Sequence, residues 1–432
     1  MSEWPDFQIP TEWSLTRMDE LATKLKAGGT PSRQNKANFG GDVPFVLIDD
    51  MTSSGVYLKS TKETITRGGL ESCSAWIVPE NTVLLSMYAT IGATVITTFP
   101  VATNQAILAI IPREDCDREY LSFCLQAHKR HLARLNVEST QKNINKGIVS
   151  SFPLPLPPLP EQKKIAHILS TVQRAIEAQE RIIQTTTELK KALMHKLFTE
   201  GLRQEPQKQT EIGPVPESWS PITLGELCGK PNGALQTGPF GSQLHKHEYQ
   251  EDGIAVVNPT HLAGNRINHE NVPRVSEQVA QRLGKHRLRK FDILFARRGE
   301  IGRQGLVTDA EETWLCGTGC FLVRASKPFI DNRFLALYFA TDRLVKWLYS
   351  HAAGAIMPNL NNAVMQRLPV FYPDLHSQTT IIETFATIDQ KLSAAEGRQT
   401  ALQDLFRTLL NELMTAKIRV HELDFSTGEH PA

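Results

Sequence analysis

Basic residues gather in one short stretch of a chain that is nearly neutral overall. The 432 residues include 47 Lys and Arg against 46 Asp and Glu, a formal net charge of +1. Between residues 285 and 303 the only acidic residues are Asp292 and Glu300. Local clustering of cations is the electrostatic footprint of phosphate contact, and the alternative is a solvated surface that binds nothing. The basic residues are Lys285, Arg287, Arg289, Lys290, Arg297, Arg298 and Arg303.

Two cysteines come closest to a metal-binding motif. Cys316 and Cys320 are separated by three residues, but no second Cys or His pair follows at zinc-finger spacing. His245 and His247 are expected to be solvent-exposed side chains rather than ligands. We therefore expect no metal site in this chain.

Motifs for catalysis on nucleic acid are missing from the sequence. A methyltransferase that acts on DNA bases needs a glycine-rich cofactor loop and an Asn/Asp-Pro-Pro-aromatic tetrapeptide. The nearest fragment, Asn258-Pro259-Thr260, lacks the second proline and the aromatic residue. No GxxxxGK[ST] phosphate loop and no GxSxG nucleophile motif occur. We expect no catalytic residue and interpret the chain as a binding protein.

The chain contains an internal duplication. WSLTRMDEL at 13–21 recurs as WSPITLGEL at 219–227, 206 residues later. NIN at 143–145 recurs as NLN at 359–361, 216 residues later, and the rest of each repeat aligns without a further gap. Insertions are tolerated in loops and are costly in packed helices. Each half is therefore predicted to hold a variable globular domain followed by a helix of fixed length, in a molecule with pseudo-two-fold symmetry.

Two long helices are predicted, over residues 161–200 and 377–417. In both, apolar residues recur at three- and four-residue spacing and no proline interrupts the pattern. A helix of about 40 residues is roughly 60 Å long and needs a partner for its apolar stripe. Two such stripes favour an antiparallel intramolecular coiled coil; the alternative is that each helix packs on its own domain. Gly397 weakens the second helix by about 1 kcal/mol.

The globular parts, about 10–152 and 214–372, are predicted to be α+β. Short β-like runs such as AILAII at 106–111 alternate with glycine-rich turns, and helices are expected at 118–135 and 331–350. Mixed short strands with one or two helices are typical of the α+β class.

Composition indicates an ordinary globular protein. Hydrophobic residues make up 41% and charged residues 22%, and the length suits two or three domains. No apolar run approaches the roughly 20 residues that span a bilayer, and no secretory signal is visible. The six cysteines show no CxxC spacing, which favours a reducing compartment. We expect a cytoplasmic protein without a membrane partner.

Four segments of the first half carry a family resemblance: GGTPSR (28–33), NINKG (143–147), PLPPLPEQKKIA (155–166) and KALMHKLFTEGLR (191–203). With the duplication, they resemble the specificity subunits of type I restriction–modification systems over nearly the whole chain. The second copy departs from the pattern, because LHSQTTII at 375–382 replaces the proline-rich motif and Gly201 has no counterpart.

The resemblance implies a DNA-binding subunit without an active site. Two target-recognition domains each read one half of a bipartite site in double-stranded DNA, and the long helices set the spacer and dock two modification subunits. S-adenosylmethionine, ATP and Mg²⁺ are expected in partner subunits, which comprise two methyltransferases and two ATP-dependent restriction subunits. The alternatives are a single enzyme whose motifs have diverged beyond recognition, a coiled-coil adaptor that ignores DNA, and a type IIB-like specificity subunit.

The implied boundaries divide the chain into six parts. They are 1–152 for the first recognition domain, 153–203 for the proline-rich entry and central helix, 204–213 for a linker, 214–374 for the second recognition domain, 375–420 for the C-terminal helix and 421–432 for a tail.

Candidate DNA contacts follow from the side chains that read bases and hold phosphates, which are mainly Arg, Lys, Asn, Gln, Ser and Thr. In the first domain the candidates are Thr30, Ser32, Arg33, Tyr88, Thr90, Asn104, Gln105, Thr140, Gln141, Lys142 and Asn143. In the second they are Gln236, Thr237, Ser242, Arg297, Arg298, Arg303, Asn359 and Asn361. For each, the alternative is a turn-forming or surface role.

Overall fold

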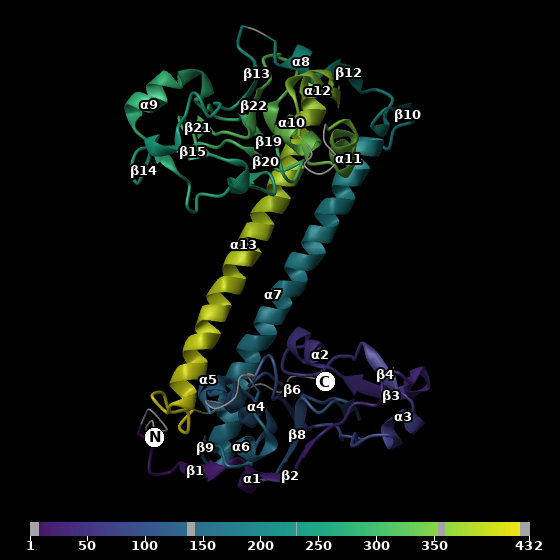
Figure 1. Ribbon diagram of the computed structural model, residues 1–432, viewed down its shortest axis with the longest axis vertical. Helices are drawn as coiled ribbons and strands as arrows, with labels where there is room; N and C mark the ends of the chain where they lie inside the picture. The colour runs from purple at the N-terminus through teal and green to yellow at the C-terminus, as the bar shows by residue number, and fades with distance from the viewer. Residues whose placement is uncertain (1–7, 136–142, 230, 353–358, 424–432) are drawn as a thin grey trace. The chain divides into compact units, whose positions relative to one another are not determined.

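The computed structural model describes residues 8–135, 143–229, 231–352 and 359–423. The chain divides into two compact units, unit 1 (1–183 and 394–432) and unit 2 (184–393). Each unit joins one globular domain to parts of two long helices, α7 (Leu159–Glu200) and α13 (Leu375–Met414) (Figure 1).

Unit 1 is built around a four-stranded antiparallel sheet of order β2-β8-β5-β6 and a three-stranded sheet of order β4-β3-β7. A separate pair, β1 and β9, precedes α7. The elements are β1 (Ser14–Arg17), α1 (Met18–Leu21), β2 (Ala22–Ala27), η1 (Lys36–Asn38), β3 (Phe39–Val46), α2 (Ile48–Ser53), β4 (Glu63–Ile65), α3 (Arg67–Glu71), β5 (Val83–Ser86), β6 (Thr94–Ile96), β7 (Ala102–Thr103), β8 (Ile107–Pro112), α4 (Arg118–Ala127), α5 (Lys129–Arg134), α6 (Lys146–Ser150) and β9 (Pro153–Leu156).

The four-stranded sheet of unit 1 is covered on both faces. Along β5, Val83 and Leu85 pack with residues of α4 and α7, while Leu84 packs on the opposite face with Val46. Side chains of successive strand residues point to opposite faces, so a strand buried on both faces consists of apolar residues only. This explains the apolar run Val83–Leu85; Ser86, the last residue of the strand, is also buried and donates its hydroxyl hydrogen to the carbonyl of Tyr88 (2.8 Å).

Unit 2 repeats this architecture. It has two four-stranded sheets: one of order β13-β22-β19-β20, which corresponds to β2-β8-β5-β6, and one of order β14-β18-β15-β21, in which β15 pairs in parallel with β21 as β3 pairs with β7. The elements are β10 (Gln207–Thr210), β11 (Gly213–Pro216), β12 (Ser220–Thr223), α8 (Leu224–Leu227), β13 (Ala234–Thr237), η2 (Lys246–Glu248), β14 (Tyr249–Gln250), β15 (Ile254–Val257), η3 (Pro259–His261), β16 (Leu262–Ala263), β17 (Arg266–Ile267), β18 (Arg274–Val275), α9 (Glu277–Arg282), η4 (Gly284–His286), β19 (Ile293–Ala296), β20 (Gln304–Leu306), β21 (Leu315–Cys316), β22 (Cys320–Arg324), α10 (Asn332–Phe339), α11 (Asp342–His351), α12 (Asn362–Arg367) and β23 (Pro369–Tyr372).

Two glutamines show that the duplication extends to individual hydrogen bonds. Buried Gln162 accepts the N–H of Asp117 (2.8 Å) and donates to the carbonyl of Pro157 (2.8 Å). Gln378, its counterpart in the repeat, accepts the N–H of Asp331 (2.9 Å) and donates to the carbonyl of Pro373 (2.9 Å). Each glutamine thus fastens the start of a long helix to the loop before α4 or α10. The α+β prediction and the duplicated architecture are confirmed.

The two long helices pair in antiparallel fashion within each unit. In unit 1, Gln399 donates to Glu180 (3.3 Å), while Arg419, just beyond α13, donates to Glu161 near the start of α7 (2.7 Å). In unit 2, Lys190 forms an ion pair with Asp389 (2.5 Å). The predicted coiled-coil pairing is confirmed, and the helix bounds lie within three residues of those expected. No helix in the described ranges is long and apolar enough to cross a membrane.

Two segments expected to connect elements form strands instead. The tract before α7 forms β9, which pairs with β1; its prolines, 153 and 155, alternate with residues that keep an N–H, so the strand can pair along one edge. Within the expected linker 204–213, β10 forms a hairpin with β11.

Candidate nucleic-acid interface

Three loops lie together at one end of the sheet β2-β8-β5-β6, and three lie together at the same end of the sheet β13-β22-β19-β20. In unit 1, β8 is antiparallel to both neighbours, so it begins where β2 and β5 end: Leu108 pairs with Ala27, and Ile107 pairs with Ser86. The loop end of unit 1 is defined here as 28–30, 87–92, 104–106 and 143. In unit 2, β22 begins where β13 and β19 end, and the equivalent loop end comprises 238–240, 297–303, 317–319 and 359.

Most of the candidate residues of the first domain meet at this loop end. Thr30 donates to the amide oxygen of Gln105 (2.5 Å), which joins the loop after β2 to the loop before β8. Tyr88 pairs through its backbone with Asn143. The residues brought together are Thr30, Tyr88, Thr90, Asn104, Gln105 and Asn143. Tyr88, Thr90 and Gln105 are exposed.

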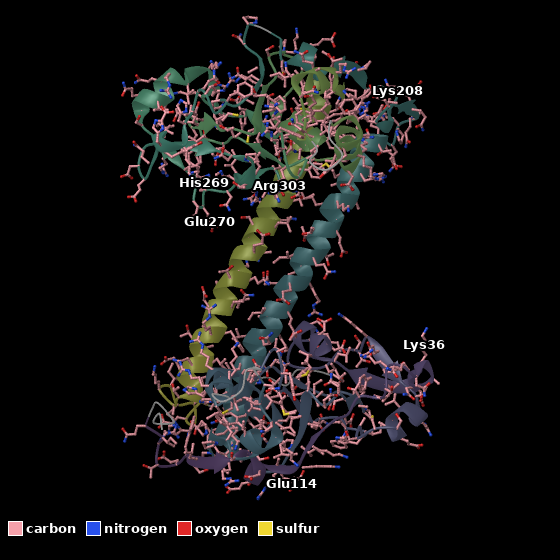
Figure 2. The ribbon with its side chains drawn as sticks, viewed as in Figure 1. Lys36, Glu114, Lys208, His269, Glu270 and Arg303 are labelled. Carbon is pink, nitrogen blue, oxygen red and sulfur yellow. The ribbon has the colours of Figure 1, made fainter. Side chains whose placement is uncertain are left out.

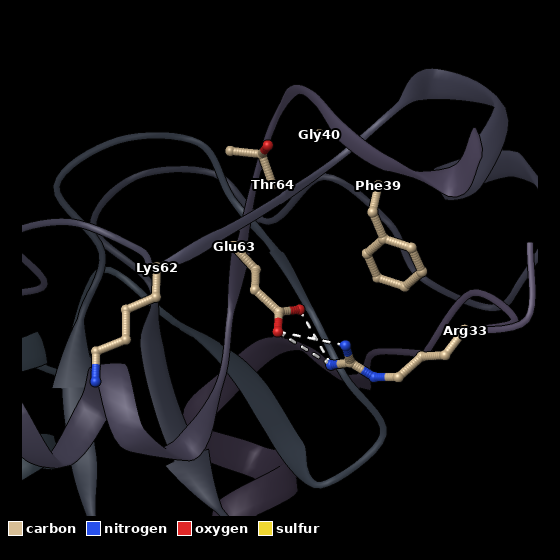
Figure 3. A pocket seen from close by; sticks show the side chains of 6 residues that line it. All are labelled: Arg33, Phe39, Gly40, Lys62, Glu63 and Thr64. Carbon is tan, nitrogen blue, oxygen red and sulfur yellow. Dashed lines mark hydrogen bonds and ion pairs between the residues drawn. The ribbon is translucent and has the colours of Figure 1, made fainter. Parts of the chain in front are cut away.

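Arg33 lies apart from this group, against the second sheet. Its guanidinium donates to Glu63 of β4 (3.0 Å) and stands 5.2 Å from the ring centroid of Phe39 in β3 (Figure 3). Ser32, in the same loop, is exposed, and its carbonyl accepts from Asn38. Candidates Thr140, Gln141 and Lys142 lie outside the described residues.

The second domain places its arginines at the loop end of unit 2. Arg297 and Arg298 follow β19 directly, and Arg303 precedes β20. Asn359 pairs with Arg298 through the backbone. Thr237 is the last residue of β13 and lies directly before the first segment of this loop end.

Three other candidates in unit 2 have different surroundings. Gln236 donates to the carbonyl of Lys285 (2.5 Å), and Ser242 is exposed in the turn that follows Phe240. Asn361 accepts the N–H of Val364 (2.9 Å) and thereby caps α12.

The basic stretch of the sequence does not form one patch. Arg289 and Lys290 precede β19, whereas Arg297 and Arg298 follow it, and a four-residue strand is about 13 Å long. Lys290 also forms an ion pair with Asp309 (2.7 Å). The single electrostatic footprint inferred from the sequence is therefore divided between opposite ends of a strand.

The arginines of the loop end of unit 2 differ in how firmly they are held. Arg297 donates through Nε to the carbonyl of Leu360 (3.2 Å), and its guanidinium lies 5.9 Å from the ring centroid of Phe240. Arg303, labelled in Figure 2, forms an ion pair with Glu300. Arg298 is exposed.

Phe240 is a surface residue that sequence reasoning missed. Its side chain is 54% exposed, which is unusual for a residue of this size and polarity. The signal was present, since an aromatic residue stands inside the glycine- and proline-rich segment TGPFGS. An exposed ring beside an arginine can contact a thymine methyl group or a base face.

Glycine is required where each loop leaves its sheet. A Cβ on Gly28 would stand 1.8 Å from the carbonyl oxygen of Thr103, and a Cβ on Gly238 would stand 1.9 Å from that of Gly317. No real contact is that short, so the backbone can approach this closely only without a side chain. The two glycine-rich segments of the sequence thus hold equivalent positions.

The two spaced cysteines of the second domain are core residues. Cys316 and Cys320 are fully buried, and burial raises the pKa of both thiols, which keeps them protonated. A protonated thiol is neither a nucleophile nor a good metal ligand. The described part of the chain contains no cluster of three or more side chains suited to a metal ion. His245 and His247 are exposed, as expected, with their rings stacked at 5.4 Å.

A family model described as the type I restriction modification DNA specificity domain matches this chain twice, at residues 10–187 and 216–403. The chain belongs to this family. The two matches start 206 residues apart and end 216 residues apart, the same offsets as the internal repeat. Each copy of the specificity domain therefore comprises one globular domain and most of one long helix.

Curated relatives are similar along their whole length. The type I restriction enzyme MjaVIII specificity subunit of Methanocaldococcus jannaschii is 25% identical over 98% of this chain and 97% of its own. The EcoBI specificity subunit of Escherichia coli is 23% identical over 98% and 91%. The crystal structure of the type I S subunit from M. genitalium matches with a TM-score of 0.59 at 18% identity, over 96% of this chain and 98% of that one. This chain and the M. genitalium S subunit thus share the same fold.

Proposed function

We propose that this chain is the DNA-specificity subunit of a type I restriction–modification complex and carries no active site. The observation that supports this most is the presence of two specificity domains, each presenting exposed polar or basic side chains at one loop end. Full-length similarity to specificity subunits supports the same assignment. Type IIB-like and adaptor functions are not favoured by these relatives.

Each recognition domain reads one half of a bipartite site in double-stranded DNA. Arginine pairs with the guanine edge, asparagine and glutamine pair with adenine, and serine or threonine holds phosphates. The loop ends carry these residue types, led by Thr90 and Gln105 in unit 1 and by Arg298 in unit 2. Exposed loops on a rigid sheet are the usual carriers of such contacts.

The helices set the spacer between the half-sites and dock two modification subunits. Those subunits hold S-adenosylmethionine and methylate adenine, and two restriction subunits supply ATP- and Mg²⁺-dependent translocation and cleavage. This chain contributes the selection of the site and the frame on which the complex assembles. The compartment that suits this role is the cytoplasm, where the DNA is.

A DNA-binding titration with and without modification subunits tests this function. We expect the complex to bind its site specifically and the isolated chain to show no tight specific binding at physiological salt. The reason is that most of the affinity for DNA comes from the attraction of the phosphates, and a chain of net charge +1 has little overall attraction for them. Tight specific binding by the isolated chain would contradict the division of labour, and a complex without DNA-dependent signal would indicate an adaptor.

A further inference from the structure

The turn that follows β5 and the turn that follows β19 have the same backbone frame. Positive φ angles occur at Ala89 (53°) and Gly92 (85°) in the first turn, and at Gly299 (81°) and Gly302 (96°) in the second. These four residues occupy equivalent positions, 210 residues apart.

Hydrogen bonds hold both turns in the same way. The N–H of the residue before the turn donates to the carbonyl of the residue that precedes the paired strand β8 or β22: Met87 to Ala106 (2.8 Å) and Arg297 to Gly319 (2.7 Å). The same residues accept from the NIN and NLN segments, through the N–H of Ile144 (3.0 Å) and of Leu360 (3.0 Å). The repeated Asn-apolar-Asn motif is thereby the clamp of each turn.

One position of this frame is an exposed residue of different chemistry in the two domains. Tyr88 and Arg298 each follow the clamped residue and pair through the backbone with Asn143 and Asn359, respectively. Tyr88 is 39% exposed, and Arg298 is exposed as well. The backbone of the turn is thus the same in both domains, while the exposed side chain that it carries differs. A position that reads bases requires this combination of a rigid backbone and a side chain that can change.

Of the three arginines at this loop end, Arg298 has the fewest side-chain interactions among the described residues. Arg297 is tied to Leu360 and stacked near Phe240, and Arg303 is paired with Glu300. Among the described residues, Arg298 has no ion pair and no side-chain hydrogen bond. Its five donors remain available for a partner with two adjacent acceptors.

We propose that Arg298 reads a guanine in the second half-site, and that Tyr88 occupies the equivalent reading position of the first domain. This rests on the proposed function. Arginine forms two parallel hydrogen bonds with O6 and N7 of guanine in the major groove. A tyrosine at the same place offers one hydroxyl and an apolar ring, so the first domain does not require guanine there. Arg297 is a positioning residue that holds the turn against the NLN segment.

The test uses the assembled complex and an R298Q variant, with R289Q as the matched control. Both residues are exposed arginines of unit 2, but Arg289 stands before β19 and Arg298 after it. Sites are mapped by methylation across a genome, and specific binding is measured against oligonucleotides altered at one base pair. We expect R298Q to lower discrimination at one G·C pair by roughly 5- to 150-fold, or to exchange it for A·T. R289Q should leave the site unchanged.

A second variant tests whether the two positions are equivalent. Y88R transfers the arginine to the frame of the first domain. We expect Y88R to create a preference for guanine in the first half-site. The second half-site should stay as in the parent, and its recognition shows that the complex is intact. An unchanged first half-site would overturn the equivalence of the two positions.

The remaining outcomes are distinguishable. If the parent complex shows no sequence preference, the proposed function is wrong, and the role of Arg298 as a base reader is wrong with it. If the parent has a bipartite site that R298Q leaves unchanged, only the assignment of Arg298 is overturned. If R298Q weakens all sequences equally and makes the salt dependence shallower, Arg298 is a phosphate contact instead, which also overturns its role as a base reader.

Discussion

Two of the candidate arginines are held by acidic neighbours at the protein surface. Arg33 pairs with Glu63, with side-chain exposures of 57% and 33%, and Arg303 pairs with Glu300, with exposures of 43% and 62%. Exposed pairs of this kind stabilise a fold by about 0–1 kcal/mol. Either arginine can therefore leave its carboxylate for another anionic or polar partner at little cost.

Part of each candidate site was predictable at the residue scale. Side chains such as Tyr88 and Gln105 were selected by type and loop position, and the structure brings them to one end of a sheet. Arg33 is close to them in sequence, but its side chain contacts Phe39 of β3 and Glu63 of β4 instead. Phe240 was missed because an apolar residue has no donor or acceptor to mark it. Strand register, which decides these placements, depends on long-range pairing that residue spacing does not encode.

A buried histidine makes the stability of unit 1 dependent on pH. His128 is 4% exposed, and burial lowers its pKa to about 4. The unfolded chain takes up this proton near pH 6.5, whereas the folded unit does so only near pH 4. Stability is therefore complete above pH 6.5 and falls as the pH drops toward 4, by on the order of 2–3 kcal/mol for this group.

Urea unfolding at pH 7.5 and pH 5, followed through unit 1, measures this effect. H128Q is expected to be less stable at pH 7.5 and to lose less stability on acidification than the parent. H245Q, which changes an exposed histidine, is the control and should behave as the parent does. A parent-like dependence on pH in H128Q would assign the effect to other groups.

The elements differ in how well the sequence predicts them. The bounds of the long helices are predictable to within three residues. Apolar residues at three- and four-residue spacing over about 40 residues fit a helix and do not fit a strand. Strands such as β5 are four residues long and buried on both faces, so they show no alternation. The hairpin of β10 and β11 was not foreseen, because its polar residues resemble those of a linker.

Helix length is predicted to determine the spacer between half-sites. Four residues inserted after Thr187 add about one turn and roughly 6 Å, which corresponds to one or two base pairs at about 3.4 Å each. Thr185 and Thr187 are exposed, so an insertion there disturbs the apolar stripe least. We expect the same half-sites with a longer spacer in a methylome of the variant.

A one-residue insertion at the same place is the control. It rotates the following stripe by about 100° and should damage folding rather than shift the spacer. An active four-residue variant with the parental spacer would show that helix length does not set the distance.

At the scale of the whole molecule, the duplication is the feature that connects sequence to function. The two halves share sheet order, the glutamine contacts and the frame of the turn after β5 or β19. They differ in the side chains that the frame presents, such as Tyr88 and Arg298. A molecule that repeats its framework and varies its exposed loops is suited to reading two different half-sites independently.

Exchange of one domain tests whether the two domains read their half-sites independently. Residues 10–150 are replaced by the corresponding domain of a relative with a known site, the chain is assembled with its modification subunits, and methylated adenines are mapped across a genome. We expect one half-site to become that of the relative, while the other half-site and the spacer stay the same. A change in both half-sites together, or in neither with methylation retained, would contradict independent reading by two domains.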